Sequence, residues 1–163
     1  MIRLPRRTAY AATAALAGTL ALGGCGSSSG SGSDSDSEPG ARPELKPSGA
    51  YMPQPVMNDM AGGFMVIENK GDEDDKLTSV TSDIAKTVEM HKTVDQQMQQ
   101  VKSFPVPADG ELALSRGGNH LMFLDLKRKP AEGDKVTVKL HFEKSDPITV
   151  SVPVKATNYT PAK

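Results

Sequence analysis

Short apolar segments alternate with clusters of turn-forming residues from residue 49 to residue 156, and this pattern constrains the fold most. No stretch of eleven or more residues keeps the apolar spacing of an amphipathic helix. Seven runs have the length or the two-residue alternation of β-strands: 63–68, 77–81, 86–91, 111–114, 121–126, 135–143 and 148–154. Clusters of Asn, Asp and Gly separate them. We therefore predict one all-β domain, an antiparallel sandwich or barrel.

One segment and the composition of the core qualify this prediction. Residues 96–101 could form a single helical turn instead of a strand. Trp is absent and aromatic residues make up only 4% of the chain, so Leu, Val, Ile and Met must supply most of the core. Every methionine considered below therefore has core packing as an alternative role.

The N-terminus has the composition of a secretory signal. Residues 1–24 carry three arginines, then an alanine-rich apolar run, and no acidic residue. The run is shorter than the roughly 20 residues that a membrane-spanning helix needs. It ends in Leu22-Gly23-Gly24-Cys25, which resembles the lipobox of bacterial lipoproteins. That resemblance implies cleavage before Cys25, the only cysteine, and lipidation of its sulfur, so that the protein is held on the extracytoplasmic side of the cell membrane.

A flexible segment is expected after the anchor. Residues 26–40 are rich in Ser and Gly, a composition that behaves as flexible coil. We therefore divide the chain into a lipoprotein signal peptide (1–24), a lipid anchor and tether (25–48), the β domain (49–156) and a C-terminal tail (157–163). Without the signal, sixteen basic residues face twenty acidic ones, and no basic cluster indicates a nucleic-acid partner.

Four side chains within the β domain form a ligand set for monovalent copper. His91, Met98, His120 and Met122 offer two imidazoles and two thioethers, with no thiol in the domain. Thioether sulfur is a soft, neutral donor that suits Cu(I) and is ignored by Mg²⁺ and Ca²⁺. Strand alternation places His91 on the face opposite Met90, which points to the core, and places His120 and Met122 on one face of their strand. The polar stretch between His91 and Met98 could fold back as a loop or hairpin.

The same residues carry a family resemblance. Met98, twenty-one intervening residues and His120-Leu121-Met122 resemble the second half of the ligand motif of PCu(A)C-type extracytoplasmic copper chaperones, and Val88–His91 resembles the strand with the first histidine. The likeness extends over residues 50–155, including Gly117-Gly118 before His120. Six residues separate His91 from Met98, fewer than the family commonly has.

The resemblance implies a cupredoxin-like Greek-key fold that holds one Cu(I) near the surface. It also implies transfer of the ion to a copper-accepting protein, an oxidase subunit or a Sco-type protein, during assembly of cytochrome c oxidase. We expect a monomer that catalyses no reaction. Copper affinity should weaken below about pH 6.5, because an imidazole must be neutral to donate to a metal.

Two other clusters have alternative interpretations. Met52, Met57 and Met60 could form an auxiliary copper-capture patch, but core packing and an edge-strand loop are the favoured interpretation. The acidic run 72–75 lacks the spacing and the central glycine of a calcium loop, so we interpret it as a solvated turn. His141 matches no motif and is expected to be an ordinary strand residue.

Four other functions remain to be weighed against chaperone activity. The protein could buffer or sequester copper, or it could be an envelope lipoprotein whose methionines only pack. An electron-transfer blue-copper protein would need a Cys ligand, and Cys25 lies outside the domain. A hydrolytic or metal-dependent enzyme is disfavoured because the chain has no Ser-His-Asp or Cys-His arrangement among the candidate residues.

Overall fold

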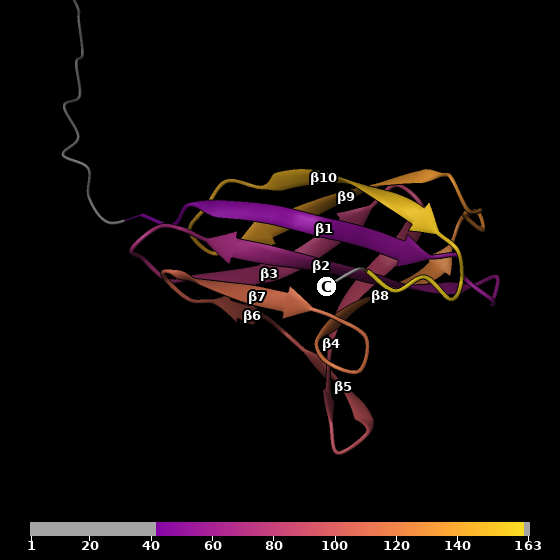
Figure 1. The fold of residues 1–163 in the computed structure, drawn as a ribbon, viewed down its shortest axis with the longest axis horizontal. Coiled ribbons are helices and arrows are strands. Elements are labelled where there is room, and N and C mark those ends of the chain that lie inside the picture. Colours follow the sequence, from indigo (N-terminus) through magenta and orange to yellow (C-terminus); the bar gives the residue numbers. More distant parts are fainter. Residues whose placement is uncertain (1–41, 162–163) are drawn as a thin grey trace, which may run out of the picture. The chain divides into compact units, whose positions relative to one another are not determined.

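The computed structural model describes residues 42–161, which form ten β-strands (Figure 1). The strands are β1 (Leu45–Pro53), β2 (Met60–Asn69), β3 (Asp75–Ser82), β4 (Ala85–Val94), β5 (Gln97–Val101), β6 (Phe104–Val106), β7 (Gly110–Leu114), β8 (His120–Leu126), β9 (Lys135–Phe142) and β10 (Ile148–Lys155). Residues 42–161 contain no helix, and therefore none that could cross a membrane. The expected signal peptide, Cys25 and most of the expected tether lie outside the described residues.

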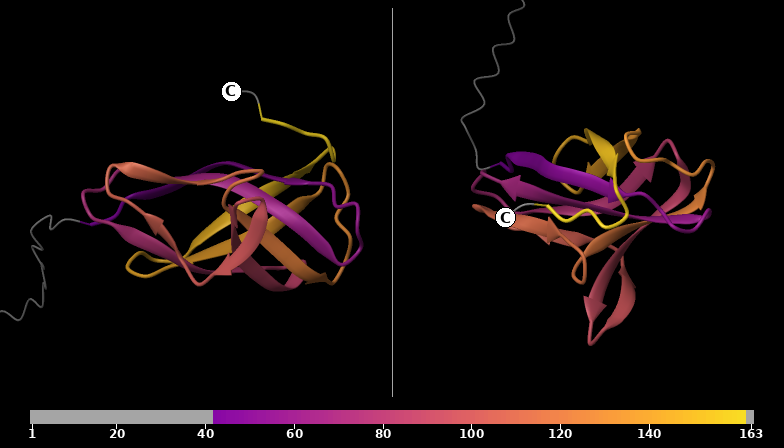
Figure 2. Two further views of the ribbon diagram at one scale, coloured as in Figure 1. Left: turned by 90° about the horizontal axis from the view of Figure 1, so that it is seen from below. Right: turned by 45° about the vertical axis from the view of Figure 1, so that its right-hand side comes forward.

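The strands follow the order β5-β4-β8-β2-β1-β10-β9-β3-β6, and β7 pairs with β2 off this path. β2 changes partner along its length: residues 60–63 pair with β8, whereas residues 65–69 pair with β7. Strands shared in this way let the sheet fold into two layers: β1, β2 and β7 pair with one another in one layer, and β10, β9, β3 and β6 pair with one another in the other (Figures 1 and 2). The predicted all-β fold is confirmed. One pair, β1 with β10, is parallel, so the sheet is mixed and not purely antiparallel.

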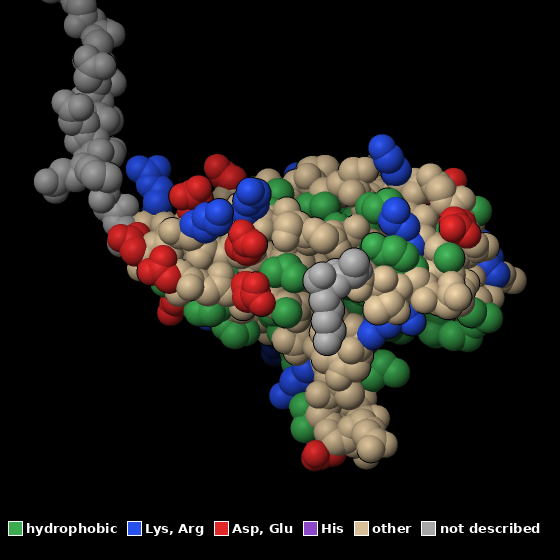
Figure 3. Space-filling view, in the orientation of Figure 1, with side chains coloured by type: hydrophobic (Ala, Val, Ile, Leu, Met, Phe, Trp, Pro, Cys, Tyr) green, Lys and Arg blue, Asp and Glu red, His purple; other side chains and the backbone are tan. Residues whose placement is uncertain are grey.

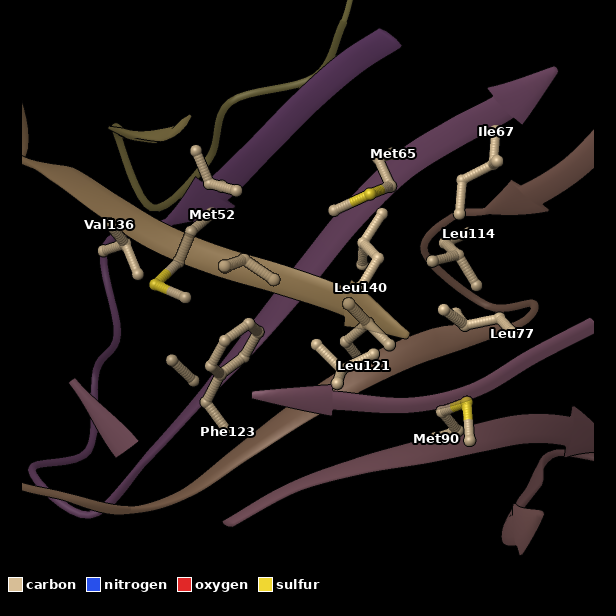
Figure 4. Packing of buried hydrophobic residues seen from close by; sticks show 14 of the residues in the cluster. Met52, Met65, Ile67, Leu77, Met90, Leu114, Leu121, Phe123, Val136 and Leu140 are labelled. Atoms are coloured by element: carbon tan, nitrogen blue, oxygen red, sulfur yellow. The ribbon is translucent and has the colours of Figure 1, made fainter. Parts of the chain in front are cut away.

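The core lies between the two layers and is built almost entirely of aliphatic side chains and methionine (Figure 4). Phe123 and Leu121 project into it from β8, and Leu140 projects into it from β9. Met52, Met65 and Met90 are also buried there, with at most 6% of their surface exposed. The near-absence of aromatic residues is therefore compensated by flexible thioether side chains that fill the gaps.

Three strands and two boundaries differ from the sequence-based expectation. β1, β5 and β6 were not expected, and residues 97–101 form a strand, so the helical turn proposed over 96–101 is wrong. The domain begins at β1, four residues before the expected start at Gly49, because Leu45–Ser48 pair with β2. The expected tail is not separate either: the ring of Tyr159 packs edge-on against Tyr51, with 5.1 Å between centroids.

The acidic run before β3 is only partly a solvated turn. Asp75, its last member, has 1% of its surface exposed and begins β3. Its carboxylate accepts hydrogen bonds from the backbone N–H groups of Lys76, Lys144 and Ser145 and from the Ser145 hydroxyl, at 2.6–3.0 Å. Burial raises the pKa of Asp75, but these four hydrogen bonds outweigh it and leave the pKa below its ordinary value. The carboxylate therefore ties the start of β3 to the chain that follows β9.

Candidate metal centre

The antiparallel pairing of β4 with β8 places the two candidate histidines directly opposite each other. His91 is the register partner of His120, and their ring centroids lie 5.7 Å apart. One ion could bond both rings at this separation, because each metal–nitrogen bond spans about 2 Å. Met90 is buried in the core and His91 is only partly buried, so strand alternation orients the pair as expected.

A tight hairpin brings Met98 to the same face. β4 and β5 are joined by Asp95 and Gln96, whose φ angles of 49° and 64° are typical of a type I′ turn. Met98 pairs with Thr93, two residues from His91 on the same side of β4. The two-residue turn thus accounts for the short spacing between His91 and Met98. The hairpin projects from the body of the domain (Figures 1 and 2), and Met98 is 65% exposed on it.

Met122 completes the set from β8. It lies two residues beyond His120 and pairs with Glu89, which lies two residues before His91. Directly opposed residues share a face of a sheet, as do residues two apart on one strand. His91, Met98, His120 and Met122 therefore all lie on the outer face of the β5-β4-β8 segment, opposite the core side chains Met90 and Leu121.

A hollow of about 350 Å³ opens on this face. Met98, His120 and Met122 line it, together with Gly62, Phe64, Thr93, Arg116 and Gly117. His91 does not line the hollow but stands beside His120 at its edge. The structure thus brings the four predicted residues to one site that is walled by the sheet and open at the hairpin.

One ring nitrogen of each histidine is held by a hydrogen bond. Nδ1 of His120 lies 2.9 Å from the carbonyl oxygen of Gly118, and Nε2 of His91 lies 2.8 Å from a carboxylate oxygen of Glu89. A carbonyl and a carboxylate can only accept, so each of these nitrogens carries the proton as donor. The lone pairs then fall on Nε2 of His120 and Nδ1 of His91. Nδ1 of His91 is buried and has no hydrogen-bond partner.

This arrangement is typical of metal-binding histidines. Such residues almost always donate their second ring N–H to a carboxylate or a backbone carbonyl, which fixes the tautomer and the ring orientation. An imidazole nitrogen that is buried without a partner costs free energy unless a ligand satisfies it. The donor set of the site therefore fits a soft cation.

Sequence reasoning missed the residues that support the ligands. Glu89 lies two residues before His91 on β4, and its role as the hydrogen-bond acceptor of that ring was not anticipated. Arg116 and Phe64 also line the hollow, with the guanidinium 5.7 Å from the centroid of the ring. The i, i+2 spacing of Glu89 and His91 could have indicated the first contact, whereas the second joins β2 to a distant loop and leaves no sequence pattern.

The auxiliary methionines and His141 do not line the hollow that contains Met98 and His120. Met52 is fully buried in the core, which agrees with the favoured core-packing interpretation and excludes it from a surface copper-capture patch. Met57 is 53% exposed, and Met60 is partly buried at the start of β2. His141 lies on β9 and pairs with Ser79 on β3. Its ring nitrogen Nε2 lies 3.4 Å from the Thr81 hydroxyl, away from the candidate centre.

Comparison with known families identifies the chain. A family model described as "Putative lipoprotein LpqE-like" matches residues 38–154. The chain belongs to this LpqE-like family. It is also 35% identical over 101 residues to "Putative lipoprotein Lxx21020" of Leifsonia xyli subsp. xyli (strain CTCB07), a match that covers 59% of this chain and 61% of the relative. The chain thus aligns with less than two thirds of that relative's length.

Solved structures similar to this LpqE-like chain are PCuAC domains and a copper protein. The apo PmoF2 PCuAC domain superposes with a TM-score of 0.64 at 22% identity, covering 72% of this chain and 94% of that domain. The solution structure of CuI-DR1885 from Deinococcus radiodurans has a TM-score of 0.61 at 25% identity, covering 75% of this chain and 85% of that one. The cupredoxin-like fold and the resemblance to PCuAC domains are confirmed.

Proposed function

We propose that this LpqE-like protein is a membrane-anchored extracytoplasmic copper chaperone. One Cu(I) binds through His91, Met98, His120 and Met122 and is then delivered to an acceptor protein. Cu(I) is the cargo of the protein, and no reaction is catalysed. The similar solved structures support this proposal, since one of them is titled as a copper-bound PCuAC domain from PmoF2 and another as CuI-DR1885.

The observation that carries the proposal is the hydrogen bonding of the two imidazoles. Glu89 and the Gly118 carbonyl hold the second nitrogen of each ring, so the free lone pairs lie on Nδ1 of His91 and Nε2 of His120. These nitrogens can then donate to an ion without a change of tautomer. In an envelope lipoprotein whose methionines only pack, no ligand would satisfy the buried, unpartnered Nδ1 of His91.

The exposure of the donors supports delivery in preference to permanent retention. His120 is 7% exposed and lies at the base of the site, whereas Met98 is 65% exposed on the projecting hairpin. An acceptor could displace Met98 first, while the other donors still hold the ion. Neutral thioethers bind Cu(I) less tightly than thiolates would, and they do not form disulfides outside the cell.

The expected arrangement in the cell follows from the N-terminal sequence. Residues 1–24 would direct export, and lipidated Cys25 would hold the protein at the membrane on its extracytoplasmic side. The Ser/Gly segment after Cys25 would let the copper site reach an acceptor at the membrane surface. An oxidase subunit or a Sco-type protein is the acceptor that we propose, and copper-centre assembly is the role.

Anaerobic Cu(I) titration against a competing chelator tests the proposal. The wild-type protein should bind Cu(I) at the four-donor site, and His120→Ala should weaken that binding by roughly 100-fold or more, beyond the effect of losing an outer hydrogen-bond partner. His141→Ala is the matched control, because it removes the third histidine without touching the site. Equal affinity in wild type, His120→Ala and Met122→Ala would refute the assignment.

Delivery is tested separately from binding. The copper-loaded protein should transfer Cu(I) to an oxidase copper-centre domain faster than free chelated copper does. A protein that retains the ion in the presence of every such acceptor would act as a copper buffer, and the chaperone role would then be wrong.

A further inference from the structure

A second hollow lies directly beside the candidate copper site. It measures about 290 Å³ and is lined by Met57, Met60 and Met122 among largely apolar neighbours. Gly62, Phe64, Arg116 and Met122 line both this groove and the hollow that contains Met98 and His120. Met122 therefore stands on the shared wall, with a candidate copper ligand set on one side and two further thioethers on the other.

The pairing of β2 with β8 explains why Met60 and Met122 line the same groove. Gly62 pairs with Met122, and Met60 pairs with Leu124, so Met60 and Met122 are diagonal neighbours on the same face. Diagonal neighbours are about 7–8 Å apart at the backbone and within reach of long side chains. Gly62, opposite Met122, has no side chain, and a Cβ there would lie only 3.4 Å from the Phe64 ring. The glycine thus leaves the space that the groove occupies.

Met57 is held at this groove by an anchored loop. Between β1 and β2, the Lys129 ammonium donates to the Val56 carbonyl at 2.8 Å, and the Gln54 N–H donates to the Lys155 carbonyl at 2.7 Å. The large hydrophobic side chains exposed on the described part of the chain are Val56 and Met57 on this loop and Val94 and Met98 on the β4–β5 hairpin. Hydrophobic side chains also appear on the space-filling surface at the end of the molecule where this loop lies (Figure 3). Met57 is therefore exposed on a loop whose backbone is held by these two hydrogen bonds.

We propose that Met57, Met60 and Met122 form a second Cu(I) site that captures the ion and passes it to the four-donor site through the shared thioether of Met122. Three thioethers with no charged donor make a soft, neutral ligand set that selects Cu(I) over harder cations. This inference rests on the proposed function of the neighbouring site. Transfer is a ligand exchange: the bonds to Met57 and Met60 break as bonds to His120, His91 and Met98 form, and copper stays monovalent.

The groove site should be the weaker of the two. It offers no imidazole, because its potential donors are the thioethers of Met57, Met60 and Met122. The guanidinium of Arg116 is held against the Phe64 ring and donates to the Thr157 carbonyl at 3.0 Å, and it lines both hollows, so its charge acts on a cation at either site. Among the described residues no carboxylate lines the groove, whereas at the four-donor site Glu89 contacts His91. This gradient favours movement of Cu(I) from the groove toward the histidines.

Anaerobic Cu(I) titration of the full protein with ¹³C-methyl-labelled methionine tests the proposal. The first equivalent should shift the methyl signals of Met98 and Met122. Because a thioether sulfur has two lone pairs and can bridge two Cu(I) ions, further Cu(I) should then bind Met57, Met60 and the same Met122 sulfur and shift the signals of Met57 and Met60. The double variant Met57→Leu/Met60→Leu keeps volume and apolar character and should lose the second binding event while keeping the first. Met65→Leu is the matched control, since Met65 is on the same strand as Met60 but is buried in the core.

The outcomes separate the two proposals. If the first equivalent shifts Met98 and Met122 but excess Cu(I) never shifts Met57 or Met60, the groove site is wrong and the chaperone site stands. If no equivalent shifts Met98, Met122 or the imidazole signals of His120, the proposed function itself fails. Loss of the second event in the double variant but not in Met65→Leu would support the groove site.

Discussion

The methionines in the described part of the chain divide into a core group and a surface group. Met52, Met65 and Met90 are buried between the two layers of the sheet, whereas Met57, Met60, Met98 and Met122 lie around two adjoining hollows. Both groups use the same thioether side chain. Core methionines fill irregular space, whereas the surface methionines are the residues that we propose as ligands of a soft ion.

Strand alternation is the physical cause of the division. Met90 and His91 are consecutive on β4, and the first is in the core while the second faces the site. Met60 and Met65 lie on one strand five residues apart, which places them on opposite faces. The position of a methionine in the pleat therefore decides its role, and residue type alone does not.

The largest effect on stability is expected from a core methionine. Met52→Ala should lower the free energy of unfolding by about 2–5 kcal/mol, because it leaves a cavity at a fully buried position. Met98→Ala, at an exposed position, should change it by less than about 0.5 kcal/mol. Chemical denaturation without copper measures both. The effects on Cu(I) affinity should have the opposite order. Met98→Ala should weaken binding more than Met52→Ala, and a folded Met52→Ala protein should still bind Cu(I). Loss of copper binding by folded Met52→Ala with retention by Met98→Ala would contradict the division.

The carboxylates Asp75 and Glu89 allow a similar comparison between core and site. Asp75 accepts hydrogen bonds that hold the fold together, whereas Glu89 accepts one from the candidate ligand His91. Asp75→Asn keeps the shape of the side chain but removes the charge that four donors surround, and it should cost about 1.5–3 kcal/mol. The folded-state pKa of Asp75 is lowered, so its contribution is present above the ordinary carboxyl pKa of 3.8 and is lost as pH falls through the folded value.

Acid denaturation followed by circular dichroism measures this contribution. Wild-type stability should decline as the pH falls below about 4, and Asp75→Asn should be less stable at neutral pH with a flatter acid limb. The exposed neighbour Asp74, whose carboxylate accepts one hydrogen bond from the Ala108 N–H, gives the matched control Asp74→Asn. Equal acid profiles for wild type and Asp75→Asn would show that the four hydrogen bonds contribute little.

Much of the fold was predictable because most strands have one buried face. All seven predicted strands are present, since alternation persists wherever a strand faces both core and solvent. β5 has no such signal: Gln97, Met98, Gln99 and Gln100 are all exposed on the projecting hairpin. β1 carries Pro47 and a positive-φ Gly49, which are typical of loops, and its pairing with β2 depends on contacts about twenty residues away.

The four candidate ligands were predictable, but their support and their neighbours were not. Alternation and the family resemblance placed His91, His120 and Met122 on outward faces, and the register confirms that these faces coincide. The separation of Met52 from Met57 and Met60 needed the tertiary structure, because all three lie within nine residues of sequence. Likewise, the burial of Asp75 depends on Lys144 and Ser145, about seventy residues further along the chain.

The smallest effect is expected from Glu89, the carboxylate that orients His91. Glu89→Ala should weaken Cu(I) affinity by about 10-fold, because the His91 ring loses the acceptor that fixes its tautomer and orientation. Glu89→Gln should recover part of this loss, since the amide oxygen still accepts the Nε2 proton but carries no charge. Thr87→Ala, on the same face of β4 outside the site, is the matched control.

Ring ¹⁵N shifts distinguish an orienting role of Glu89 from simple packing. In wild type Nε2 of His91 should be the protonated nitrogen, and in Glu89→Ala the two tautomers should mix. If both the tautomer and the affinity are unchanged in Glu89→Ala, Glu89 does not support the copper site. Asp75 would then be the only one of the two carboxylates with a defined role.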